Sequence, residues 1–141
     1  MRMRFACIIG WSLLTGGLAD RSDGQYVKRA EPAAASNPIG VWRGSSLCRV
    51  RPSPCNDELV VYRITRVKAS DSLSLDARKI VIGQEEEMGV LGCRLAASGA
   101  QFTSTMPNGV WRFTIRGDSL VGELRLPDNT KYREISTARS R

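Results

Sequence analysis

Histidine is absent from the 141-residue sequence. It is the most frequent general base, a common metal ligand and the usual partner of a nucleophilic serine. The sequence also lacks a glycine-rich loop of the kind that holds phosphate groups. We therefore expect a protein that is not an enzyme and that uses no cofactor and no metal.

Acidic side chains are the remaining candidates for acid–base chemistry. They are grouped as Asp57-Glu58 and Glu85–Glu87. A pair of carboxylates can hydrolyse sugars when the two groups flank a substrate. Both groups fall at expected turns or strand ends, where solvated charges are common, so we interpret them as surface charge.

Long apolar runs are scarce as well. The main one, Phe5–Leu14, follows a short basic stretch and precedes small residues that include Gly17 and Ala19. This order is typical of a secretory signal, and the run is shorter than the roughly 20 residues that span a bilayer. We predict a signal peptide at 1–19 and a periplasmic or secreted protein that does not span the membrane.

Cysteine is sparse, and the predicted signal removes Cys7. An oxidising compartment favours pairing of two of the remaining three, Cys48, Cys55 and Cys93. Pairing of Cys48 with Cys55 is favoured because they lie close together around a proline-restricted stretch. Pairing of Cys93 with one of them is the alternative. Cys93 alternates with leucines along a strand, so we expect a buried, free and unreactive thiol.

Negative charge is in deficit. Without Arg2 and Arg4 the chain keeps 21 − 2 = 19 basic residues against 14 acidic ones, a net charge of +5. This field permits an anionic partner without requiring one. Export separates the protein from nucleic acid, so we expect no nucleic-acid partner.

Segment 20–37 has few apolar residues and is expected to be a disordered tether. The rest, 38–141, alternates apolar and polar residues with a period of two and shows no helical stripe. About eight short strands are separated by polar turns, one of them the acidic stretch Gln84–Glu87. We predict a single all-β domain, a compact antiparallel up-and-down barrel of about eight strands; a five-stranded barrel of the oligonucleotide/oligosaccharide-binding type is the alternative.

The phrase P-x-G-V-W-R occurs twice, at Pro38–Arg43 and Pro107–Arg112. In the second copy Asn108-Gly109 is a strong hairpin signal, because a type I′ turn needs positive φ at both central residues. A two-residue loop there would place Met106 opposite Trp111. We interpret both copies as a turn followed by a strand with its tryptophan directed inward.

A second hairpin loop is predicted at Gly117-Asp118. It places Phe113 opposite Gly122, where an aromatic ring would cover a strand glycine. It also places Arg112 opposite Glu123 as an opposite-charge pair on the outer face. The next turn is expected at Pro127–Asn129.

Gly40-Val41-Trp42 resembles the G-x-W motif that opens the first strand of lipocalin (calycin) barrels. The resemblance implies that Trp42 closes one end of the barrel beneath a basic side chain from a late strand, either Arg125 or Arg133. Small secreted bacterial protease inhibitors are similar, with an early G-x-W, one short disulfide and eight strands.

Two functions follow from these observations. The first is an exported, non-enzymatic binding protein of the cell envelope that holds a small apolar or anionic ligand at the barrel mouth, with Trp42, Tyr62, Tyr132 and Arg125 as binding residues. The alternative is a protein-interaction module, such as an inhibitor of an exported or host protease, that acts through loops and tether. We expect a monomer with a filled or nearly filled interior; a pocket above about 300 Å³ would favour the small ligand.

Overall fold

The computed structural model describes residues 36–141, which form an all-β, closed antiparallel barrel of eight strands. Each strand pairs with its neighbours in sequence, and the first pairs with the last. The strands are β1 (Gly40–Cys48), β2 (Glu58–Arg66), β3 (Ser72–Val81), β4 (Gln84–Leu95), β5 (Gln101–Met106), β6 (Gly109–Arg116), β7 (Ser119–Arg125) and β8 (Lys131–Arg139). The up-and-down barrel is confirmed. The signal peptide at 1–19 and nearly all of the tether at 20–37 lie outside the described residues.

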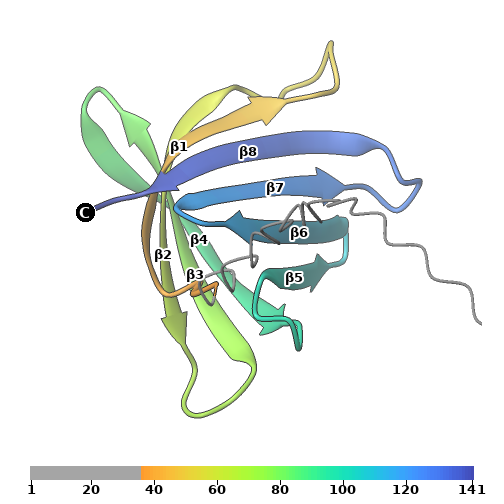
Figure 1. Cartoon of the computed structure of the whole chain (residues 1–141). Coiled ribbons are helices and arrows are strands. Elements are labelled where there is room, and N and C mark those ends of the chain that lie inside the picture. The colour runs from red at the N-terminus through yellow and green to blue at the C-terminus, as the bar shows by residue number, and fades with distance from the viewer. Residues whose placement is uncertain (1–35) are drawn as a thin grey trace, which may run out of the picture. The chain divides into compact units, whose positions relative to one another are not determined.

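Two layers of strands make up the barrel. Figure 1 shows β5, β6, β7 and β8 side by side, at a steep angle to β2, β3 and β4, while β1 bends from one group to the other. The described part of the chain contains no helix that could cross a membrane.

Inward-facing residues alternate with exposed ones along each strand, as the period of two predicts. On β2, Val60, Tyr62 and Ile64 are buried at 5% exposure or less. They join one core cluster that includes the fully buried Trp42 and Phe102. The cluster draws buried side chains from all eight strands.

The β5–β6 hairpin differs from its predicted register. Met106 pairs with Gly109, and Ser104 rather than Met106 pairs with Trp111, so the loop is Pro107-Asn108. Proline has no N–H for a strand ladder and suits the first corner of a turn, whereas the predicted register would have paired it within the strand. The shift is by two residues, so the predicted inward faces are retained.

The β6–β7 hairpin agrees with its prediction. Gly117 has a φ of 60°, and Phe113 pairs with Gly122. A Cβ on Gly122 would lie 2.8 Å from the Phe113 ring, so the aromatic does cover the glycine. Arg112 stands opposite Glu123, but the ion pairs of Glu123 are with Arg125 at 2.7 Å and Lys131 at 3.3 Å.

Two further turns can be compared with the sequence. Asn129 has a φ of 70°, consistent with the predicted turn at Pro127–Asn129. The predicted acidic turn Gln84–Glu87 is wrong, because these residues begin β4 and the turn is Ile82-Gly83. Glu85 lies instead between two arginines of β1 and β2, which neutralise it within the sheet.

Strands β4 and β5 form the weakest junction of the barrel. Only Arg94 with Thr103 and Leu95 with Phe102 are paired across it. The remainder of β4 pairs with β3 alone, with a β-bulge at Met88. The two layers therefore separate along this junction.

Candidate functional site: a cavity beside the open junction

A cavity of about 380 Å³ borders the core, with which it shares Tyr62, Ala77 and Phe113. Its polar residues are Ser46, Glu58 and Arg133, and its other lining residues are Tyr62, Ala77, Met88, Gly89, Val90, Leu91, Trp111 and Phe113. The cavity is open to solvent beside Met88 and Val90, which are 41% and 59% exposed, so the expectation of a filled or nearly filled interior stays a prediction. The space exists because β4 separates from β5 and because Ala77 and Gly89, which face each other across β3 and β4, carry little or no side chain.

Aromatic rings line one wall of the cavity. Phe102 stacks on Phe113 with a centroid distance of 4.7 Å, and Trp111 stacks on the same Phe113 at 5.5 Å. Phe102 and Phe113 are buried, whereas Trp111 is half-buried. The stack thus runs from the filled core to the cavity.

Arg133, near the start of β8, forms the polar end of the cavity. One nitrogen of its guanidinium donates to Ser46 Oγ at 2.8 Å and to Glu58 Oε2 at 3.1 Å. The two charged side chains are only 15% and 22% exposed. Because Arg133 and Glu58 carry opposite charges in contact, the polar end has no net charge.

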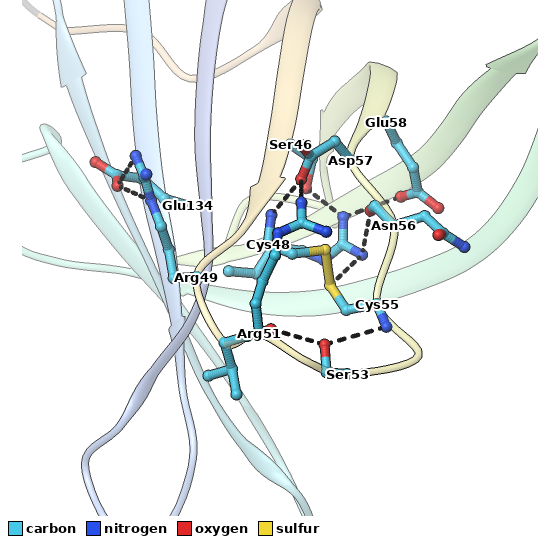
Figure 2. Close-up of polar contacts among 12 residues, drawn as sticks. Ser46, Cys48, Arg49, Arg51, Ser53, Cys55, Asn56, Asp57, Glu58 and Glu134 are labelled. Atoms are coloured by element: carbon cyan, nitrogen blue, oxygen red, sulfur yellow. Dashed lines mark hydrogen bonds and ion pairs between the residues drawn. A yellow bond between two sulfur atoms is a disulfide. The ribbon is translucent and has the colours of Figure 1, made fainter.

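The disulfide loop lies against the same guanidinium. The other terminal nitrogen of Arg133 contacts Cys55 Sγ and the Asn56 carbonyl oxygen, each at 3.1 Å. Figure 2 shows the Cys48–Cys55 disulfide among Ser46, Asn56 and Glu58, at the end of β1 and the start of β2. Arg133 therefore links β8 to this loop as well as to the cavity.

The predicted Cys48–Cys55 pairing is confirmed, with a Cα–Cα distance of 5.9 Å. The backbone N–H of Cys48 donates to Asp57 Oδ1, which also pairs with Arg51 at 2.8 Å. Cys93 is free and buried, and burial raises its pKa to about 11. Its thiol stays protonated at neutral pH, as expected for an unreactive cysteine.

Tyr62 lines the cavity close to its polar end. Burial raises the pKa of its hydroxyl to about 12, although a hydrogen bond with Ser46 and the charge of Arg133 act in the opposite direction. The phenol is therefore uncharged at neutral pH. It adds a neutral polar group to an end that is already charge-balanced.

The four residues predicted to bind a ligand do not converge. Tyr62 lines the cavity, but Trp42 is fully buried in the core. Tyr132 lies at an irregularity of the β7–β8 pairing and does not line the cavity. Arg125 pairs with Glu123 and donates to the Asn129 carbonyl oxygen, at the β7–β8 turn.

Trp42 has a basic side chain over its ring, as the lipocalin resemblance implies. The residue is Arg139, whose Cζ lies 4.2 Å from the ring centroid, and not Arg125 or Arg133. Trp42 and Arg139 are register partners on β1 and β8, whereas Arg125 and Arg133 lie toward the opposite ends of β7 and β8. The indole N–H also donates to the Pro38 carbonyl oxygen at 2.9 Å.

The sequence interpretation missed Glu58 as a cavity residue and placed Arg133 only as a candidate cation for Trp42. Both could have been found from the alternation of faces. Glu58 is two residues before the buried Val60, and Arg133 is two residues before the buried Ile135. Opposite charges at inward-facing positions of two strands indicate a buried ion pair, which the interpretation of Glu58 as surface charge overlooked.

A second hollow, of about 410 Å³, is lined largely by outward-facing residues of β5 to β8 such as Arg112 and Glu123. It is slightly larger than the cavity, but its charged residue Glu123 is already paired with Arg125 and Lys131. The cavity beside Trp111 combines an apolar wall with a few convergent polar groups, which is the usual composition of a small-molecule site.

Comparison of the chain with protein-family models, with curated proteins and with solved structures finds no match. The class of protein is therefore defined by the structure alone. It is an eight-stranded antiparallel barrel with a pocket that has a polar end and an apolar wall.

Proposed function

We propose that the protein is an exported, non-enzymatic binding protein of the cell envelope that holds a small, uncharged, largely apolar ligand in the barrel cavity. The observation that carries this proposal is the cavity of about 380 Å³ with one polar end. Eight-stranded barrels can enclose one small ligand. The Cys48–Cys55 disulfide is compatible with an oxidising compartment.

The cavity also supports the first of the two functions considered from the sequence. A filled interior would have favoured a protein-interaction module such as a protease inhibitor. A pocket larger than about 300 Å³ with a mixed lining favours a small molecule. On this proposal the ligand binds in the cavity, and the surface loops serve only to connect the strands.

The choice of an uncharged ligand over an anionic one follows from Arg133. Both of its terminal nitrogens already contact protein atoms, and Glu58 lies 3.1 Å away. An anion would meet the carboxylate of Glu58 and would lose its hydration without an unpaired positive charge in return. A hydroxyl or carbonyl group can instead bond to Ser46, Tyr62 or the ion pair.

A matched pair of ligands tests this proposal. Decanol and decanoate have equal chain lengths and differ in charge at neutral pH. We expect decanol to bind at least about tenfold more tightly, a difference equivalent to about 1.4 kcal/mol. Isothermal titration calorimetry of the protein with its disulfide formed measures both affinities. If neither ligand binds, the proposed function is rejected.

Replacing Glu58→Gln should reverse the selectivity, because Arg133 then loses its counter-charge and decanoate can take that place. Glu134→Gln is the matched control, since Glu134 pairs with Arg49 outside the cavity. The control should retain the preference for decanol. If both variants prefer decanol equally, the charge balance at the polar end does not set selectivity.

A further inference from the structure

Three aromatic rings form a continuous stack that ends in the cavity. Phe113 lies between Phe102 and Trp111, with interplanar angles of 15° and 14°. The backbone explains the arrangement: Phe102 and Phe113 are register partners on β5 and β6, and Trp111 is two residues from Phe113 on the same face of β6. The rings therefore share one orientation that the barrel wall holds in place.

Trp111 is the last ring of this stack. Within residues 36–141, it stacks on no aromatic ring other than Phe113. Trp111 is half-buried and borders the cavity, whereas Phe102 and Phe113 are 0% and 2% exposed. The exposed end of the stack, Trp111, thus borders the space where a ligand would lie.

We propose that the ligand is a planar aromatic molecule that lies against Trp111 and extends the stack into the cavity. This inference rests on the proposed function and names its ligand class. Offset stacking of aromatic rings adds to the affinity that burial of area alone supplies. A planar ligand also suits a wall whose rings are already close to parallel.

The position of the polar end completes the assignment. Trp111 and the Arg133–Glu58 pair border the same cavity, together with the uncharged phenol of Tyr62. An aromatic ligand that carries one hydroxyl group could stack on Trp111 and hydrogen-bond at this end. The structure therefore favours an uncharged aromatic alcohol or phenol over an aliphatic chain of equal size.

The test compares 2-naphthol with decahydro-2-naphthol, which has the same carbon skeleton and hydroxyl group but no aromatic ring. We expect 2-naphthol to bind about fivefold more tightly, and to quench the fluorescence of Trp111. Isothermal titration calorimetry gives the affinities. Equal affinities would overturn the stacking inference and leave the proposed function standing, whereas binding of neither compound would also contradict the proposed function.

Variants locate the effect on one residue. With Trp111→Leu the ratio of the two affinities should fall to about one, and with Trp111→Phe it should be intermediate. Urea unfolding of each variant shows whether the barrel is intact. If Trp111→Leu does not fold, Trp111→Phe decides the question. An unchanged ratio of the two affinities in Trp111→Phe, together with no fluorescence quenching in the wild type, would place the aromatic ligand elsewhere.

Discussion

Replacing Trp42→Ala is expected to lower the free energy of unfolding by about 3–5 kcal/mol. Trp42 is fully buried in the core cluster, so its removal leaves a cavity that neighbouring strands cannot close. The variant also loses the hydrogen bond to the Pro38 carbonyl oxygen and the contact beneath Arg139. Urea denaturation monitored by circular dichroism measures the loss.

Trp111→Ala is the matched comparison, because both tryptophans follow the same P-x-G-V sequence. Trp111 is half-buried at the edge of an existing cavity, so its truncation should cost less than half as much. The two copies of the phrase would then have different roles, one in stability and one in binding. Equal losses in the two variants would show that the wall at Trp111 is packed as tightly as the core.

Replacing Gly44→Val is expected to destabilise the barrel by about 3 kcal/mol or more. A Cβ at Gly44 would overlap the carbonyl oxygen of Ser136 and lie 2.7 Å from Thr137 Cα. These are backbone atoms of β8, which cannot move aside as a flexible side chain can. Because β1 and β8 close the barrel, the substitution separates the two strands on which closure depends.

Gly92→Val is the control for this prediction. No atom lies within 4 Å of a Cβ at Gly92, which is exposed on β4. Valine suits a strand, so the free energy of unfolding should change by about 0.5 kcal/mol or less. Thermal unfolding of the two variants, followed in parallel, separates the effect of close approach from that of losing a strand glycine. A comparable loss in both would contradict the role assigned to the β1–β8 contact.

The barrel could be predicted from local features of the sequence. Alternation with a period of two identified the strands, and Gly117-Asp118 predicted the β6–β7 register correctly. Where two turn signals competed, the prediction failed: Asn108-Gly109 suggested one loop, but Pro107 occupies the first corner and moves the register by two residues. Proline's missing N–H was the stronger constraint.

The cavity could not be predicted in the same way, because it depends on contacts between distant parts of the chain. Arg133 and Glu58 are 75 positions apart and meet only when β8 and β2 lie on either side of β1. The space itself depends on how far β4 and β5 remain paired, which no local signal indicates. Arg139 likewise reaches Trp42 because the β1–β8 register places them together.

The most direct test of the proposed site is a titration of nitrogen-labelled protein with decanol, followed by amide proton–nitrogen correlation spectra. We expect the largest shift changes on Tyr62, Leu91 and Trp111, which line the cavity. Amides on the outer face, such as those of Arg112 and Glu123, should remain nearly unchanged. Shift changes confined to that outer face, or none at the solubility limit of the alcohol, would contradict the assignment of the barrel cavity as a binding site.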